Sequence, residues 1–290
     1  MQKYQSFQRF TWLLIILLIG GVIAILPAVI SLEAPTIITS STIASALAKI
    51  NIIYLGEKHD RLTDRQAQLE IIQLLYQQDK QIAIALEMFQ RPYQQSLDDY
   101  RKGKITEDQL RENTEFDQRW GFDWASYAPI FRFAKAHKLP LIALNVPSEI
   151  TRKVAHQDLE GLTELEKQSI PPLSEIRTDN QEYRQMVREI YEQHTHAGQG
   201  NSKNFDRFFV AQVLWDETMA DTIASFYRTN PAKKIIVIAG EFHIIYGYGI
   251  PSRVARRLSQ FSLKQRSILF GKPETFPLNK ERLPADFFFK

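Results

Sequence analysis

Cysteine is absent from the 290-residue chain. This absence excludes a disulfide framework, a thiolate nucleophile, a cysteine-type zinc site and a lipid attached through cysteine. Blocks of Lys and Arg longer than a pair are also absent, and the formal net charge is only +3. So small an excess over a whole domain gives no basic patch, and we expect no nucleic-acid partner. Internal repeats and low-complexity tracts are lacking too.

One long apolar run is present, at the amino end. Residues 12–30 carry no charge, and Lys3 and Arg9 precede them. A membrane-spanning helix needs roughly 20 apolar residues, whereas the apolar part of a cleaved signal has about 7–15. We therefore expect residues 1–31 to be a membrane anchor, with a removed signal as the alternative. The positive-inside tendency then places the rest of the chain on the periplasmic or extracytoplasmic side.

The remaining sequence predicts an α/β domain. Four short apolar runs, at 50–55, 82–86, 141–144 and 235–239, are typical of buried strands. Helical stretches separate them, which indicates a mostly parallel β-sheet covered by helices on both faces. Residues 263–270 predict an edge strand. We expect a linker at 32–43, the domain at 44–270 with a smaller subdomain of helical insertions near 92–125 and 147–202, and a tail at 271–290.

Polar residues follow the predicted strands at the point where each strand ends. The first strand leads into Gly56-Glu57-Lys58-His59, the second into Glu87, the third into Asn145 and the last into Gly240-Glu241-Phe242-His243. In open parallel sheets, ligands bind beyond the carboxyl ends of the strands. We therefore expect Glu57, His59, Glu87 and His243 to meet in one site, although a salt bridge or a turn would also explain each residue singly.

Further candidates flank these four. Met88 and Phe89 follow Glu87, and Tyr246 and Tyr248 lie in a glycine-rich loop after His243. Such side chains could stack on a flat apolar ligand or ligate it through a phenolate, and Arg253 could pair with ligand carboxylates. On the long helix predicted at about 204–228, Gln212 and Asp216 are four residues apart and could face the same pocket.

Five segments together resemble the ChaN-like haem-binding uptake family. They are LGEKHD, ALEMFQR, ALNVPSE, AQVLWDETMA and AGEFHIIYGYGIPSRV, and the resemblance covers roughly residues 44–260. The family is similar in turn to the erythromycin esterase and Tiki/TraB superfamily. The resemblance implies haem held between the two copies of a homodimer. The wider superfamily implies a metal-dependent hydrolytic centre made of Gly56/His59, Gly240/His243 and Glu87.

Three functions remain open from the sequence. The first is a haem-binding protein of haem or iron uptake at the membrane, with His59, Met88, Phe89, Tyr246, Tyr248 and Arg253 as cofactor-binding residues. The second is a hydrolase in which His59, His243, Glu57 and Glu87 serve as ligands of a divalent metal or as catalytic groups. The third is an inactive membrane-tethered scaffold. The sequence leaves open whether the protein is an enzyme.

Overall fold

The computed structural model describes residues 35–196, 204–272 and 282–290. The predicted anchor at residues 12–30 lies outside these ranges and stays a prediction. Within the described ranges, no helix combines the length and the apolar character that crossing a bilayer requires. The part of the chain after residue 31 forms one compact unit.

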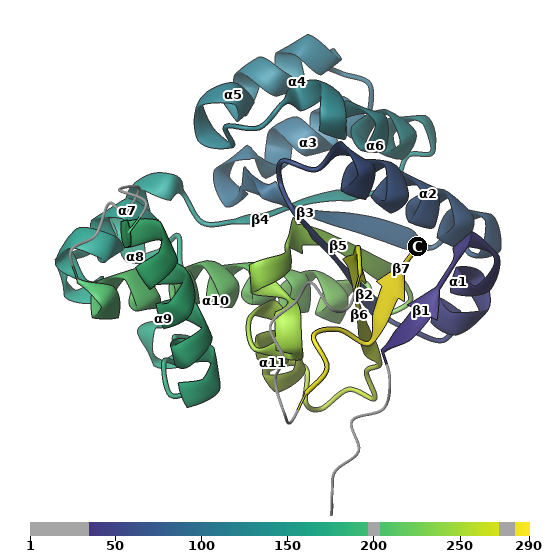
Figure 1. Ribbon diagram of the computed structural model, residues 1–290. Coiled ribbons are helices and arrows are strands. Elements are labelled where there is room, and N and C mark those ends of the chain that lie inside the picture. Colours follow the sequence, from purple (N-terminus) through teal and green to yellow (C-terminus); the bar gives the residue numbers. More distant parts are fainter. Residues whose placement is uncertain (1–34, 197–203, 273–281) are drawn as a thin grey trace, which may run out of the picture. The chain divides into compact units, whose positions relative to one another are not determined.

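Strands and helices alternate through most of this unit (Figure 1). The main elements are β1 (Thr36–Ile38), α1 (Ser40–Leu47), β2 (Ile52–Glu57), α2 (Leu62–Gln78), β3 (Ile82–Gln90), α3 (Gln94–Arg101), α4 (Glu107–Asn113), α5 (Phe116–Arg119), α6 (Trp124–Ala136), β4 (Leu141–Asn145), α7 (Ser148–Gln157), α8 (Glu164–Lys167), α9 (Gln181–His196), α10 (Phe205–Thr229), β5 (Lys234–Gly240), α11 (Ile250–Arg257), β6 (Gln265–Phe270) and β7 (Phe287–Phe289). The short 3-10 helix η4 (Glu241–His243) follows β5 directly.

Among the described residues, the strands form a seven-stranded sheet in the order β1-β7-β6-β2-β5-β3-β4. Every neighbouring pair is parallel. Parallel pairing requires long crossovers, which the helices between the strands supply. The pairing places β5 between β2 and β3, so three of the predicted polar strand ends are neighbours. The α/β fold class is confirmed.

Helices cover both faces of the sheet, and successive strand residues face opposite layers. On one face, Ile53 and Leu55 of β2 pack with α1, α2, α3 and α6. On the other face, Ile52 and Tyr54 pack with α10 and α11. Figure 1 shows the sheet between these two helical layers. Burial on both faces explains why the strands read as continuous apolar runs rather than as alternating ones.

Two sequence-based predictions about the sheet differ from the structure. The sequence predicts residues 263–270 at an edge, but β6 lies between β2 and β7. The outer positions on that side are taken by β1 and β7, three residues each, from within the predicted linker and the predicted tail. Both strands are shorter than the runs that periodicity can identify. Helices do lie in the two ranges predicted as insertions, 92–125 and 147–202.

The two longest helices begin near the predicted residues. Asn204 precedes α10, and its side chain accepts hydrogen bonds from the backbone nitrogens of Asp206 and Arg207, as expected of an N-cap. The sequence also predicts a helix that Thr63 caps, and the corresponding helix α2 begins one residue earlier, at Leu62. These two helices matter for the site because α2 supplies Arg65 and Gln68, while α10 supplies Gln212 and Asp216.

Candidate functional site

The four predicted residues meet at the carboxyl ends of β2, β5 and β3. Glu57 ends β2, and the neighbouring strand β5 ends at Gly240. The ring of His59 lies over Gly240, because a Cβ placed on that glycine would be 2.8 Å from Nε2 of His59 and 3.7 Å from Oε2 of Glu87. Nε2 of His243 is 3.3 Å from the other oxygen, Oε1, of Glu87. The predicted convergence is therefore observed.

Glu57 orients the ring of His59. Nδ1 of His59 is 3.0 Å from Oε1 of Glu57, whose side chain is fully buried. The same oxygen accepts a hydrogen bond from the hydroxyl of Tyr127 at 2.5 Å, and Oε2 accepts one from the amide of Gln68 at 2.8 Å. The guanidinium of Arg65 lies 3.4 Å from Glu57. With Nδ1 occupied in this way, Nε2 is the nitrogen of His59 that remains for a ligand.

His243 is held on both ring nitrogens. Oδ1 of Asp216, on α10, lies 2.7 Å from Nδ1, and the hydroxyl of Tyr183 donates to Oδ2 of Asp216. Gln212 also contacts Nδ1, at 3.2 Å. Because Glu87 faces Nε2, this imidazole has no free nitrogen. The two histidines thus share one arrangement, in which a carboxylate that bonds a tyrosine orients each ring. They differ at Nε2, which faces Glu87 in His243 and has no partner among the described residues in His59.

Glu87 lies where the pairing of β3 with β4 is irregular. The register shifts between Leu86 and Gln90, and such irregularities redirect side chains. The amide of Asn145, at the end of β4, donates to the carbonyl oxygen of Glu87 at 3.2 Å. The backbone nitrogen of Gly240 donates to Oε2 at 2.6 Å. Asn145 and Gly240 therefore fix the position of the carboxylate between the two imidazoles.

Charges within the site move the pKa values of Glu87 and both histidines. Burial alone would raise the pKa of Glu87, but the charge and hydrogen bond of His243 outweigh it and lower the pKa. Burial lowers the pKa of His243, yet Glu87 and Asp216 together hold it well above its ordinary value. For His59, the hydrogen bond to Glu57 and the charge of Glu87 overcome burial and raise the pKa. At neutral pH, His243 and Glu87 therefore form a buried ion pair.

This ion pair predicts a pH-dependent stability. The pKa of His243 is near 6.5 in the unfolded chain and higher in the folded chain, so above that pH the folded state holds an extra proton. The free energy of unfolding should therefore fall as the pH rises from about 6.5 to about 10, the pKa of His243 in the folded chain. Urea unfolding across this range measures the slope, which His243→Gln should reduce. A flat wild-type profile, or an unchanged slope in the variant, would contradict the assignment.

Aromatic side chains surround the open histidine. The ring centroid of His59 lies 4.7 Å from that of Trp120 and 5.0 Å from that of Phe122. Phe122 is among the exposed large hydrophobic residues, at 36%. The His59 side chain is itself 26% exposed. The open imidazole therefore lies at a partly exposed aromatic surface. Trp120 and Phe122 come from the helical insertion, where no sequence pattern indicates their role.

Five residues that the sequence predicts as cofactor contacts are buried in other parts of the core or bonded to other protein groups. Met88 and Phe89 are buried in the core under α6, where the ring of Phe89 packs against Phe116 and Phe131. Tyr246 and Tyr248 belong to another buried cluster with Tyr183. Arg253 donates to the carbonyl oxygens of Tyr248 and Gly249 and pairs with Glu217 at 3.3 Å. Their strand-end and loop positions predict exposure, but tertiary packing buries them.

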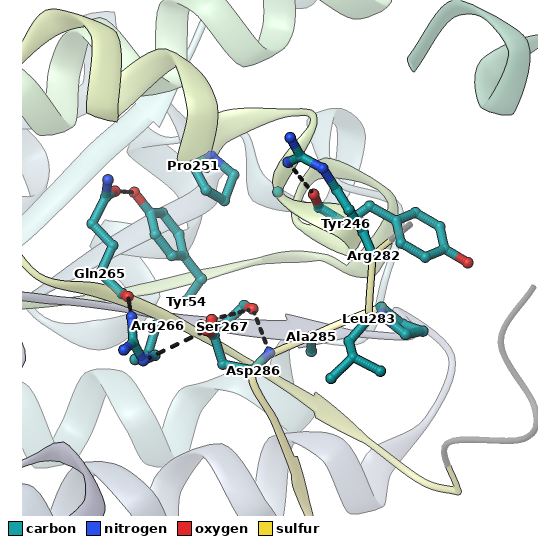
Figure 2. A pocket seen from close by; sticks show the side chains of 12 residues that line it. Tyr54, Tyr246, Pro251, Gln265, Arg266, Ser267, Arg282, Leu283, Ala285 and Asp286 are labelled. Atoms are coloured by element: carbon teal, nitrogen blue, oxygen red, sulfur yellow. Dashed lines mark hydrogen bonds and ion pairs between the residues drawn. The ribbon is translucent and has the colours of Figure 1, made fainter. Parts of the chain in front are cut away.

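The lining residues of a cavity of about 400 Å³ (Figure 2) include none of the four convergent residues. Tyr54, Pro251 and Ala285 are among the residues that line it, and Arg282 donates to the carbonyl oxygen of Tyr246 at its rim. Neither His59 nor His243 lines this cavity. In the described ranges, no group of three or more His, Asp or Glu is arranged to hold a metal ion. Among the predicted metal ligands, Glu57 contacts Nδ1 of His59, and Glu87 contacts Nε2 of His243.

Two of the solved structures that resemble this chain are a ChaN protein and an erythromycin esterase. A ChaN protein of Campylobacter jejuni, solved with cofacially bound haem, is 18% identical and has a TM-score of 0.62 over 84% of this chain and 89% of its own. An erythromycin esterase is 18% identical, with a TM-score of 0.49 over 84% and 77% of the two chains. At this identity, the likeness to the ChaN structure concerns the fold.

A curated relative, the chloroplastic protein RETICULATA-RELATED 5 of Arabidopsis thaliana, is 24% identical over 81% of this chain, and the chain spans about a third (33%) of its length. The family profile described as "Haem-binding uptake, Tiki superfamily, ChaN" matches residues 43–254, which include every residue of the site. The chain therefore belongs to the ChaN family of haem-binding uptake proteins in the Tiki superfamily.

Proposed function

We propose that this protein binds haem at the carboxyl edge of its sheet, where Nε2 of His59 would coordinate the iron. The observation that carries the proposal is how the two nitrogens of this imidazole are hydrogen-bonded. Glu57 holds Nδ1 at 3.0 Å, and no partner of Nε2 is found among residues 35–196, 204–272 and 282–290. A ligating histidine has this arrangement, with one nitrogen fixed by a carboxylate and the other available.

The other candidate ligands are less suited to the role. Both nitrogens of His243 are engaged, by Asp216 and Glu87, and the residue is 6% exposed. A phenolate ligand requires loss of the tyrosine proton, but burial and the neighbouring Tyr248 raise the pKa of Tyr246 to about 12. Both Tyr246 and Tyr248 are also buried in their cluster. His59 is therefore the preferred ligand.

The surroundings of His59 fit a large, flat and mostly apolar ligand. Because residue 240 is glycine, no Cβ occupies the side of the ring that carries Nε2. Trp120 and Phe122 pack against His59 and extend the apolar surface to solvent. When bound there, haem would supply an iron centre for coordination, while the chain's own residues orient the imidazole and exclude water from its buried edge. The family and the haem-binding Campylobacter jejuni structure agree with this proposal.

Titration of the full chain with haemin tests the proposal. Saturable binding of one haem per chain, with a shift of the Soret band, is the expected result. The same titration after incubation with Zn²⁺ or Mn²⁺ examines the hydrolase alternative. A divalent metal that binds stoichiometrically and blocks haem uptake would contradict the proposal. Sedimentation of the loaded chain then shows whether haem brings two copies together, as the family resemblance predicts.

Substituting Gly240 should lower the haem affinity, because it displaces the ring of His59. In Gly240→Ala, the new Cβ would lie 2.8 Å from Nε2, so the ring must move. We expect the haem affinity to fall at least about tenfold, the order found when support for a metal ligand is lost. Gly103→Ala is the control. Gly103 has a φ of +74°, so alanine should lower the stability there too, but no atom lies within 4 Å of the new Cβ. Equal haem affinities in the two variants would contradict the predicted role of Gly240.

A further inference from the structure

We propose that the cavity lined by residues of α11, β6 and the segment 282–286 is a second ligand site, which takes a small carboxylic acid with a compact apolar body. Neither His59 nor the aromatic residues around it line this cavity. The second site therefore shares no residue with the proposed haem site.

The cavity has an apolar floor and a charged mouth. Tyr54 and Ala285 line it and are buried, whereas Arg266, Arg282 and Asp286 line it and are exposed. Its volume of about 400 Å³ falls in the range of about 300–1,000 Å³ that is typical of small-molecule pockets. A ligand with an apolar body and one polar end matches this distribution of side chains.

The charges at the mouth leave one arginine for a ligand. Nε of Arg266 lies 3.5 Å from Oδ1 of Asp286, whose Oδ2 accepts hydrogen bonds from the backbone nitrogen and Oγ of Ser267 at 2.7 Å and 2.9 Å. Arg282 has no carboxylate partner in the part of the chain that the structure describes, and it donates to the carbonyl oxygen of Tyr246 at 3.4 Å. A guanidinium has five N–H donors, and a carboxylate accepts two of them in parallel. A ligand carboxylate therefore complements the positive charge that remains on Arg282.

The opposite side of the cavity offers an apolar surface. The hydroxyl of Tyr54 donates to the side-chain oxygen of Gln265, so it already has an acceptor. Figure 2 shows this pair and the guanidinium of Arg282 on opposite sides of the cavity. The ring of Tyr54 thus receives the apolar end of the ligand, while Arg282 binds the carboxylate.

The wall formed by Tyr246 and Gly247 is fixed by the protein itself. Both residues have a positive φ, 57° and 71°, which is uncommon for a side chain as large as tyrosine. The backbone nitrogen of Tyr246 donates to the carbonyl oxygen of Pro284 at 2.9 Å, which holds this conformation. A Cβ on Gly247 would meet no atom within 4 Å, so the glycine leaves space open beside the wall. Backbone held in this way is typical of preformed ligand sites.

A pair of fluorinated probes tests the site. The carboxylate 6-fluoro-2-naphthoate and its neutral counterpart 6-fluoro-2-naphthamide are titrated against the full chain and followed by ¹⁹F NMR. We expect wild type to bind the carboxylate with a Kd below about 1 mM and to prefer it over the amide. Arg282→Gln should reduce this preference about tenfold, the order expected for a lost charge-assisted hydrogen bond. Arg111→Gln, the same change at an exposed arginine of α4, should keep the wild-type preference.

Ala285→Leu tests where the probes bind. The added isopropyl group enters the cavity from its floor, so both probes should lose saturable binding, and urea unfolding checks that the variant is folded. Because Arg282 is exposed, Arg282→Gln remains decisive even if Ala285→Leu does not fold. No saturable binding to wild type, or an unchanged preference in Arg282→Gln, would overturn the proposal. Binding that is lost in Phe122→Ala but kept in Ala285→Leu would place the probes on the aromatic surface beside His59 and would overturn it as well.

Discussion

Replacing His59 with alanine is expected to abolish saturable haem binding. The variant removes the ring nitrogen that has no partner among the described residues, whereas the buried ion pair of Glu87 and His243 remains. Loss of the axial ligand should leave only weak adsorption to the aromatic surface of Trp120 and Phe122. Haemin titration should therefore show no Soret shift at concentrations that saturate wild type.

Two controls make this result specific. His156 is exposed, and its Nδ1 contacts the carbonyl oxygen of Arg152, so His156→Ala should bind haem as wild type does. Added imidazole should restore the Soret shift to His59→Ala, because it can occupy the space left by the side chain. If His59→Ala shows the wild-type Soret shift without imidazole, a residue other than His59 binds the haem iron.

The largest loss of stability is expected from Glu217→Gln. Glu217 is fully buried on α10, and its oxygens lie 3.3 Å from Arg253, 2.7 Å from Arg256 and 2.5 Å from Arg257, all on α11. Its Oε1 also accepts from the backbone nitrogen of Arg177 at 3.2 Å. Removing the carboxylate leaves two buried guanidinium groups without their main partner. Such a loss typically lowers the free energy of unfolding by about 3–5 kcal/mol.

Urea unfolding of the full chain measures this effect. Glu112→Gln, an identical change at an exposed position of α4, should alter the free energy of unfolding by less than about 0.5 kcal/mol. If Glu217→Gln is as stable as Glu112→Gln, the folded state does not depend on the pairing of this carboxylate with Arg253, Arg256 and Arg257. Haem binding per folded chain should be unchanged, because Glu217 touches neither His59 nor Glu57.

The convergence at the sheet edge was predictable because it depends on topology. Parallel strands must end at the same side, so polar residues after 50–55, 82–86 and 235–239 had to approach one another. Gln212 and Asp216 were also found, because two polar residues four apart interrupt an apolar helix face. Both contact Nδ1 of His243. Placing them on one helix face near the site required only helical periodicity.

The hydrogen-bond partners of Glu57 and Asp216 could not be predicted from the sequence. Tyr127 and Tyr183 are aromatic residues on amphipathic helices, and in sequence they look like ordinary core residues. The Tyr127 hydroxyl reaches Glu57 because α6 lies over the end of β2, and the Tyr183 hydroxyl reaches Asp216 because α9 packs against α10. Arg65 and Gln68 are polar residues of α2, typical of a solvated face, yet both are buried. Long-range packing decides these contacts.

Local patterns overestimate the exposure of the loop and strand-end positions next to the site. Met88 and Phe89 follow Glu87 directly, but β3 continues to Gln90 and turns them into the core. Tyr246 and Tyr248 lie between glycines, which indicates a mobile rim, yet the segment is packed against Tyr183. In each case, burial by a neighbouring element overrides the local pattern.

The central claim is that Nε2 of His59 binds the haem iron while Glu57 holds Nδ1. The structure of the full chain crystallised with haemin tests it most directly. We predict that the iron is bonded to Nε2 of His59, that the Glu57 contact is retained, and that His243 still faces Glu87. An iron bonded to Tyr246 or Tyr248, or haem bound in the cavity beside Arg282 with His59 empty, would contradict it.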